Sequence, residues 1–283
     1  MEGYTVILFY KFTPIADPAA LAVEQRTLAE KYNLQGRMLI APEGVNATFE
    51  GTNENVEAYK LAFRANELFR EVSFKESAGT GAAFRKLEVR VRDEVVTLEA
   101  GTFDVKKETA PEITAEELEA LFKTDEDFVV LDLRNDYEIE AGKFEKTVDP
   151  GLKNFRDLPA KLPELAHLKN KKVVTVCTGG IRCEKATCLL KREGFTNLYQ
   201  LKDGIHTYMQ EYPGSKFKGT LFVFDNRMVT PVVDTPNRTV VGACAFCDAP
   251  CEVFFNDDSV RPSRKVICCD SCITEHAELR TCV

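Results

Sequence analysis

One cysteine and one arginine in this chain have the types and the spacing that nucleophilic chemistry requires. They are Cys177 and Arg182, which enclose the sequence Thr-Gly-Gly-Ile. Residues 173–176 are rich in β-branched side chains and predict a short buried strand that ends at Cys177. Residues 183–192 predict a helix, because their apolar side chains share one face and their charges run from acidic to basic. The pattern therefore predicts a strand, a tight loop and a helix.

The loop between this strand and this helix is suited to hold a negative charge. Its backbone N–H groups and the helix N-terminus would point at the sulfur, which lowers a thiol pKa and stabilises a bound anion. Glycines permit positive φ angles here, and the guanidinium of Arg182 adds a fixed positive charge. We interpret Cys177 as a nucleophile; the alternative is a small hydrophobic residue at the end of a core strand. The loop residues are Thr178, Gly179, Gly180, Ile181 and Arg182.

The length of the loop indicates which group it binds. Four residues separate Cys177 from Arg182, whereas cysteine phosphatases place five between the same two residue types. The shorter loop suits a sulfur atom or a small oxyanion better than a phosphate ester. A thiolate that attacks a sulfur donor becomes a persulfide, whose negative charge the loop amides stabilise. We recognise no flavin or nicotinamide fingerprint and no clear iron triad in the sequence.

A second group of cysteines lies near the end of the chain. Cys244 and Cys247 form one Cys-x2-Cys pair, Cys269 and Cys272 form another, and 21 residues separate the two pairs. This spacing predicts a tetrahedral metal site, for which we expect structural zinc. Few large apolar side chains occur in residues 244–283, so a metal would replace the missing core. The alternative is a loosely ordered tail with free thiols.

Other side chains of the tail could also bind the metal. His276 or Cys268 could replace one of the four cysteines, and the roles of Cys251 and Cys282 stay open. We expect the tail to be structural and to be able to touch RNA.

Composition limits the class of protein. A chain of 283 residues is long enough for two or three domains, and its 44% hydrophobic and 29% charged residues are ordinary for a globular protein. Ten cysteines without an evident signal peptide favour a reducing, cytoplasmic setting with metal or redox use. No stretch is apolar enough to span a bilayer. The net charge of −8 argues against indiscriminate nucleic-acid binding.

The first 98 residues predict a separate α+β domain. Their order βαββαβ favours a ferredoxin-like, acylphosphatase-like sandwich. The expected strands are residues 4–12, 37–41, 45–49, 72–75 and 87–98, and the expected helices are 17–32, capped by Asp17, and 53–65, capped by Asn53. The turn at residues 44–46 is interpreted as a plain hairpin. The most basic stretch is either a solvated strand face or an RNA contact, and it contains Arg85, Lys86, Arg90 and Arg92.

Residues 99–111 are expected to be a linker to an α/β domain at 112–214, and residues 215–283 form the Cys-rich extension. Strands at 128–133, 173–176 and 195–201 alternate with helices, which predicts a parallel sheet covered on both faces. Ligands bind beyond the carboxyl ends of such strands, where Cys177 lies. Arg134 either lines this pocket or forms a salt bridge with Asp132. Cys183 is either a resolving thiol beside Cys177 or a packing residue at the helix start.

These motifs resemble a known domain and a known family. The rhodanese resemblance covers residues 112–214 and rests on Asp132-Leu-Arg134, Glu138, Gly142-Lys-Phe, the loop from Cys177 to Arg182, and Leu201-Lys-Asp-Gly-Ile205. The whole chain also resembles the rhodanese-related tRNA uridine(34) hydroxylases. That match adds Ala41-Pro-Glu-Gly-Val-Asn-Ala47, the run Cys-Glu-Lys-Ala after the loop, and Phe222-Val-Phe-Asp-Asn-Arg227.

The resemblance implies oxygen-dependent formation of 5-hydroxyuridine at the wobble position of tRNA. O2 is then the co-substrate, Cys177 the essential and persulfidated residue, and the partners are the tRNA anticodon region and an unidentified donor of electrons or sulfur. The chain differs from the family pattern at two positions that affect the geometry of the loops. Lys143 stands where rhodanese domains usually have His, and Asp203 stands where this subfamily more often has Gly.

Two other functions remain open from the sequence. One is a sulfurtransferase that passes persulfide sulfur to an acceptor, and the other is a non-catalytic module that binds anions or partners. The presence of both Cys177 and Arg182 argues against the inert module. The extra sandwich and tail favour a large substrate. The oligomeric state, the tRNA species and the metal are not determined by the sequence.

Overall fold

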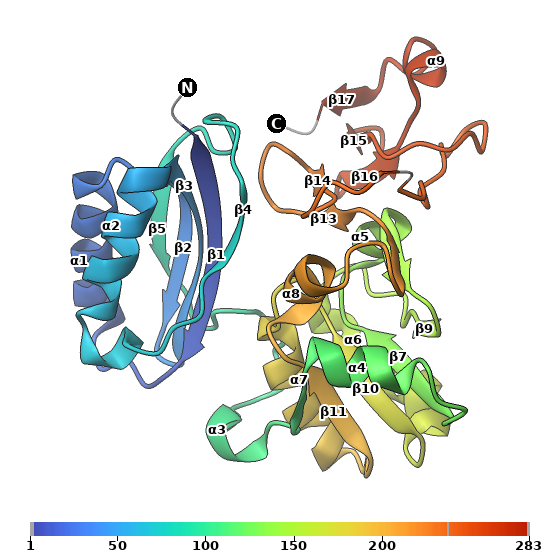
Figure 1. The fold of residues 1–283 in the computed structure, drawn as a ribbon, viewed down its shortest axis with the longest axis horizontal. Coiled ribbons are helices and arrows are strands. Elements are labelled where there is room, and N and C mark those ends of the chain that lie inside the picture. The colour runs from blue at the N-terminus through green and yellow to red at the C-terminus, as the bar shows by residue number, and fades with distance from the viewer. Residues whose placement is uncertain (1–2, 237, 282–283) are drawn as a thin grey trace. The chain divides into compact units, whose positions relative to one another are not determined.

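The computed structural model describes residues 3–236 and 238–281, and the chain divides into two compact units (Figure 1). The N-terminal unit contains Met1–Glu99 and Val105–Lys107, and the C-terminal unit contains Ala100–Asp104 and Glu108–Val283. Cys282, whose role the sequence leaves open, lies outside the described residues. Among the helices in the described part of the chain, none combines the length and apolar character needed to cross a bilayer.

The N-terminal unit is a five-stranded sheet with two helices on one face (Figure 1). The strand order is β4-β1-β3-β2-β5, antiparallel except where β5 pairs with β2. The expected ferredoxin-like sandwich is confirmed, with β5 added at its edge. The elements are β1 (Tyr4–Phe12), α1 (Pro18–Lys31), β2 (Gln35–Ala41), β3 (Gly44–Thr52), α2 (Asn53–Arg64), the 3-10 turn η1 (Glu67–Phe69), β4 (Lys75–Ala78) and β5 (Leu87–Val91).

Local sequence signals explain the helices of this unit. Asp17 caps α1 by accepting a hydrogen bond from the Ala20 N–H at 2.9 Å, and Pro18 occupies the first helical position. The N-cap of α2 is Thr52 and not the expected Asn53, because the Thr52 hydroxyl accepts a hydrogen bond from the Asn55 N–H at 3.3 Å. The expected hairpin is confirmed by the pairing of β2 with β3, but its turn lies at residues 42–43, because Ala41 pairs with Gly44 and residues 44–46 belong to β3.

Two strand predictions in this unit are wrong at their ends. The strand expected at 72–75 begins only at Lys75, and the one expected at 87–98 ends at Val91. Side chains hold the backbone beyond β5: Val95 donates its N–H to Glu43 at 2.9 Å, and its carbonyl accepts from Asn46 at 3.0 Å. These bonds replace a strand ladder, so alternating polarity alone overestimates the strand.

The C-terminal unit is built on a parallel sheet of order β6-β11-β10-β7-β9, as expected. Leu118, Val130, Val174 and Tyr208 share one core cluster, so α4 and α8 pack against one face. Its main elements are β6 (Glu112–Ile113), α4 (Ala115–Leu121), β7 (Phe128–Asp132), α5 (Asp136–Glu140), β9 (Thr147–Val148), α6 (Leu158–Leu165), β10 (Lys172–Val176), α7 (Ile181–Arg192), β11 (Leu198–Leu201) and α8 (Gly204–Glu211). The strand expected from residue 195 therefore begins at Leu198. Two 3-10 turns flank α6, η2 (Phe155–Asp157) and η3 (Ala166–Leu168).

The stretch expected as a linker is partly folded onto this sheet domain. It contains the short helix α3 (Val105–Glu108), of which only Glu108 belongs to the C-terminal unit, and Arg192 donates to Glu108 at 2.7 Å. The Ala110 N–H donates to the Thr187 hydroxyl at 3.1 Å. The chain therefore packs against α7 before the first parallel strand begins. A capping box of Thr114 and Glu117 begins α4.

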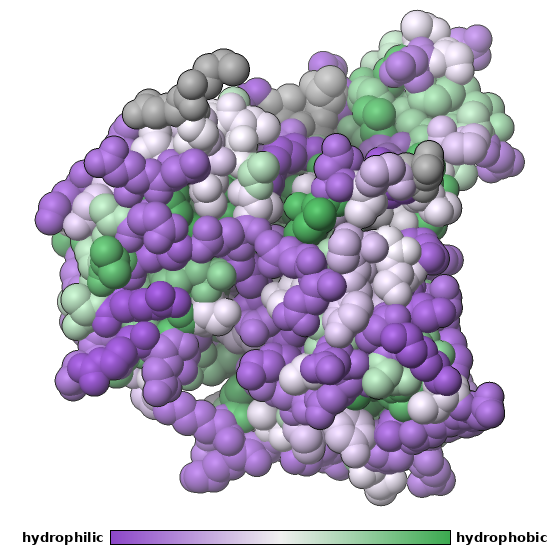
Figure 2. Space-filling view, in the orientation of Figure 1, coloured by the Kyte–Doolittle hydropathy of each residue, from purple (hydrophilic) through white to green (hydrophobic). Residues whose placement is uncertain are grey.

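The Cys-rich tail continues the C-terminal unit. A short antiparallel pair joins β8 (Gly142–Phe144) to β12 (Phe217–Gly219), and β13 (Leu221–Phe222) pairs with β14 (Val229–Thr230). The tail ends in a three-stranded antiparallel sheet of β15 (Phe254–Asp257), β16 (Arg264–Ile267) and β17 (Leu279–Thr281), with α9 (Asp270–Ile273) between the last two. Figure 2 shows pale green, moderately hydrophobic residues gathered over this end of the unit.

Candidate active site and metal centre

Cys177 lies at the carboxyl edge of the parallel sheet. It follows β10, whose last residue Val176 pairs with Asp132 at the end of β7. The Gly180 N–H donates to the Cys177 sulfur at 3.2 Å. Gly180 adopts φ 101°, a left-handed conformation that favours glycine, and directly precedes α7. The expected strand, loop and helix are thus present, and one backbone amide points at the sulfur.

The N-terminus of α8 supports the loop from the other side. The Ile205 N–H donates to the Cys177 carbonyl at 2.9 Å, and the His206 N–H donates to the Thr178 carbonyl at 3.0 Å. Gly204 fits closely here, because a Cβ at this position would lie 2.7 Å from the Cys177 carbonyl oxygen. Asp203 adopts φ 57°, which aspartate tolerates better than most residues. Asp203, which stands where this subfamily more often has Gly, is therefore compatible with the turn.

Arg182 forms an ion pair with a carboxylate that the sequence did not single out as a site residue. Its guanidinium donates to the two carboxylate oxygens of Glu138 at 2.6 and 2.9 Å, and to the Thr178 hydroxyl at 3.3 Å. Arg182 is only 7% exposed. Burial opposes its charge, but Glu138 outweighs burial and raises the pKa of Arg182. The arginine therefore stays charged and fixes the end of the loop.

Glu138 belongs to a local motif that was visible in the sequence. Its carboxylate also accepts a hydrogen bond from the Asn135 N–H at 2.9 Å, as part of a capping box at the start of α5. A capping glutamate is common, so this signal alone does not indicate an active-site partner. Only the fold brings it to Arg182.

The charge state of Cys177 follows from its neighbours. Burial raises the pKa of this thiol, whereas a hydrogen bond from the Cys183 thiol, the charge of Arg182 and backbone N–H groups lower it, and the pKa falls to about 6. Burial and the negative charge of Cys177 raise the pKa of Cys183 well above its ordinary value. These neighbours therefore favour the thiolate form of Cys177, with the Cys183 thiol as a hydrogen-bond donor to it.

Arg134 forms the salt bridge with Asp132 that the sequence offered as one of its two interpretations. It is fully buried, and its Nη2 donates to Asp132 at 2.7 Å and to the Gly142 carbonyl at 2.7 Å. Its Nη1 donates to the Glu138 carbonyl at 3.2 Å. These contacts agree with the second interpretation, a salt bridge to Asp132, and they join β7, α5 and β8.

The four basic candidates for RNA contact lie in the N-terminal unit, on and beside β5. Lys86 and Arg90 both form ion pairs with Glu88, at 2.6 and 2.8 Å. Arg85 and Arg92 are exposed at the surface. This stretch is therefore partly neutralised, and its role in RNA contact stays a prediction.

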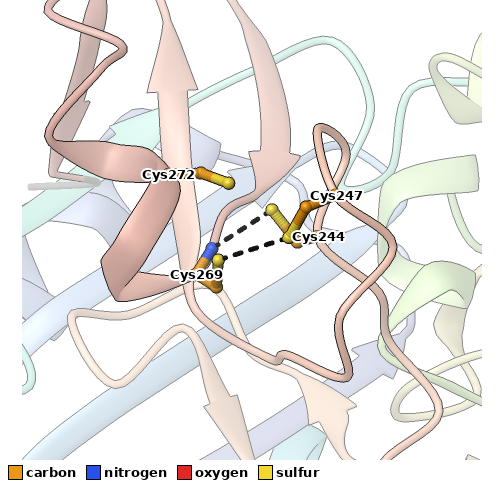
Figure 3. A group of neighbouring side chains, drawn as sticks. All are labelled: Cys244, Cys247, Cys269 and Cys272. Carbon is orange, nitrogen blue, oxygen red and sulfur yellow. Dashed lines mark hydrogen bonds between the residues drawn. The ribbon is translucent and has the colours of Figure 1, made fainter.

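The four predicted metal ligands converge in the tail (Figure 3). Their sulfur atoms all lie within 4.8 Å of one another, and those of Cys247 and Cys269 are 3.6 Å apart. Sulfur atoms around a tetrahedral zinc, with bonds of about 2.3 Å, lie about 3.8 Å apart. The donor set and its spacing therefore fit such an ion. The described group consists of Cys244, Cys247, Cys269 and Cys272.

The alternative ligands are engaged elsewhere. His276 directs its Nδ1 to Glu278 at 2.9 Å, and its ring stacks on Phe246. The sulfur of Cys268 contacts the Cys269 carbonyl at 3.5 Å, and the sulfur of Cys251 donates to the Cys268 carbonyl at 3.3 Å. These contacts leave the two Cys-x2-Cys pairs as the converging set.

Comparison with known proteins covers almost the whole chain. Residues 4–95 match the UPF0176 acylphosphatase-like domain, residues 114–211 the rhodanese-like domain, and residues 218–283 the rhodanase C-terminal family. The tRNA uridine(34) hydroxylase of Cytophaga hutchinsonii is 39% identical over 272 residues, which are 96% of this chain and 86% of that one. The chain belongs to the tRNA uridine(34) hydroxylase family.

Other relatives carry the same name. The tRNA uridine(34) hydroxylase of Staphylococcus carnosus is 37% identical and that of Enterococcus faecalis 39%, each over 99% of this chain and 88% of the relative. Among solved structures, a rhodanese-related protein from Thermoplasma volcanium is 22% identical with a TM-score of 0.30, covering 36% of this chain and 93% of its own. The family resemblance expected from the sequence is confirmed.

Proposed function

We propose that this chain hydroxylates uridine 34 of tRNA to 5-hydroxyuridine. The observation that carries the proposal is Cys177, whose sulfur accepts the Gly180 N–H in an intact rhodanese-type loop, within a chain that matches its relatives over nearly its full length. The tRNA substrate favours a cytoplasmic location.

The proposed reaction replaces the hydrogen on C5 of uridine by a hydroxyl group. With O2 as co-substrate, one oxygen atom enters the base and the other leaves as water, so two electrons and two protons are consumed. A two-electron donor must supply them. The residues of this chain contribute a nucleophilic sulfur at Cys177, an amide at Gly180 that holds its negative charge, and a fixed cation at Arg182.

Access to the sulfur requires a movement. Cys177 is 0% exposed. The base of uridine 34 must leave its stack to reach such a site, which costs least in a single-stranded loop. The anticodon loop therefore suits this enzyme better than a duplex.

We also propose that zinc, bound by the four tail cysteines, holds the tail together. Zinc would supply a closed structural site, since four thiolates leave no open coordination position. Its contribution is to folding rather than to the reaction at Cys177.

Nucleoside mass spectrometry of tRNA tests the proposed function. Cells that lack this gene should lose 5-hydroxyuridine and its derivatives, and Cys177→Ser should not restore them although the variant accumulates. Unchanged 5-hydroxyuridine in the Cys177→Ser cells would contradict the catalytic role.

A second candidate is sulfur transfer from a Cys177 persulfide. The short loop favours it, because four residues between Cys177 and Arg182 leave room for a single added sulfur. Loss of a thiolated nucleoside, with 5-hydroxyuridine retained, would support this candidate instead.

A further inference from the structure

A groove lies within the C-terminal unit, between the sheet domain and the tail. Residues 136–154 line one side and residues 241–267 line the other, around a cavity of about 1080 Å³. Small-molecule sites usually have roughly 300–1,000 Å³. The groove is therefore large enough for a segment of a polymer.

Basic side chains along the groove offer contacts to an anionic ligand. Lys143, Lys153, Arg264 and Lys265 line it, and Asp136, Glu140 and Asp248 are the acidic side chains. Lys153 is paired with Asp136, so this pair contributes little net charge. Arg264 donates from its Nε to Asp257 at 2.9 Å, but its side chain is 66% exposed, so its other guanidinium nitrogens can still donate to an anion. Four basic and three acidic side chains thus line the groove, and its exposed basic side chains supply the kind of contact that a phosphate backbone uses.

An aromatic ring is exposed in the same groove. Phe246 is 43% exposed, and one face of its ring stacks on His276, with centroids 3.5 Å apart and planes 22° apart. It lies between Cys244 and Cys247, so the metal-ligand group restrains its backbone. A restrained ring with one covered face can stack a nucleobase on its other face.

The groove and the Cys177 loop share helix α5. Tyr137 lines the groove and packs its ring against Phe222 at 5.1 Å between centroids. The next residue, Glu138, holds Arg182 of the loop. A polymer in the groove therefore lies against the same helix that fixes the active loop.

We propose that this groove binds single-stranded RNA, with phosphates near Lys143 and Arg264 and a base stacked on Phe246. The inference rests on the proposed function and adds the surface that receives the RNA. This surface is distinct from the basic stretch around β5, which lies in the N-terminal unit.

Binding of a fluorescently labelled anticodon stem-loop RNA with uridine at position 34 tests the proposal. Phe246→Ala should weaken RNA binding by about five- to 150-fold. Phe246→Trp should retain the wild-type affinity, because stacking needs only an aromatic face. Lys143→Glu should weaken binding and reduce the slope of log affinity against log salt by about one. Lys171→Glu is the matched control, since this partly exposed lysine of the same unit precedes β10 and does not line the groove.

The outcomes separate this proposal from the proposed function. Cys177→Ser should bind the RNA normally while cellular 5-hydroxyuridine disappears. Normal RNA binding by both Lys143→Glu and Phe246→Ala would assign the groove to another partner and overturn the proposal. Absence of RNA binding by the full-length wild-type protein would also overturn it. If Phe246→Ala loses metal or unfolds, Lys143→Glu decides, because that residue lies on β8, outside the tail.

Discussion

Arg182 and Glu138 form a buried bidentate ion pair, with nitrogen–oxygen distances of 2.6 and 2.9 Å, 44 positions apart in the chain. The pair connects the end of the Cys177 loop to α5. It fixes a charged guanidinium within the electrostatic reach of the Cys177 sulfur, and this charge helps to lower the thiol pKa. Three predictions follow from this site and from the tail.

Glu138→Gln should destabilise the C-terminal unit. The substitution leaves the buried charge of Arg182 without its counter-ion, and breaking a buried pair in this way costs about 3–5 kcal/mol. Urea unfolding, followed by a signal from this unit, measures the loss. Glu164→Gln is the control, because Glu164 is 66% exposed in its pair with Lys161 and should change the unfolding free energy by less than about 1 kcal/mol. Equal effects of the two variants would refute the structural importance of the buried pair.

The thiolate of Cys177 should form as the pH rises through about 6, well below the value of about 8.5 for an ordinary thiol. The ultraviolet absorbance of the thiolate, taken as the difference between wild type and Cys177→Ser, follows this titration. Cys183→Ala should move the midpoint to higher pH, because the variant loses a hydrogen bond to the charged form.

Cys188→Ala provides the comparison for that titration. The Cys188 thiol donates to the Glu184 carbonyl at 3.1 Å, and is not among the groups that lower the Cys177 pKa, so its removal should leave the midpoint in place. A Cys183→Ala midpoint equal to that of wild type would mean that the Cys183 thiol does not stabilise the thiolate.

Removal of the metal should loosen the tail. Purified protein should contain about one zinc per chain, and Cys272→Ser or a strong chelator should abolish it and increase hydrogen exchange in residues 244–281. Cys251→Ser should retain the metal, because this sulfur is not part of the converging group. A metal-free wild-type protein with an equally protected tail would contradict the proposed site.

Short-range signals explain why much of the fold was predictable. Caps such as Asp17 and Thr114 act within one helical turn, and β-branched runs specify buried strands such as β10. The loop after Cys177 and both Cys-x2-Cys pairs are also local, so the candidate nucleophile and the metal ligands could be identified. Strand ends were less predictable, because side chains distant in sequence, such as Asn46 and Glu43, hold the backbone after β5.

The amino-acid sequence by itself determined the order of elements, the nucleophilic loop and the cysteine pairs, because each depends on residues a few positions apart. Only the tertiary structure decided that Arg182 pairs with Glu138, that Arg134 is fully buried, and that Lys143 and Phe246 line one groove. These relationships join side chains from separate elements. Their energies depend on burial and distance, which the packing of the chain establishes and no local pattern encodes.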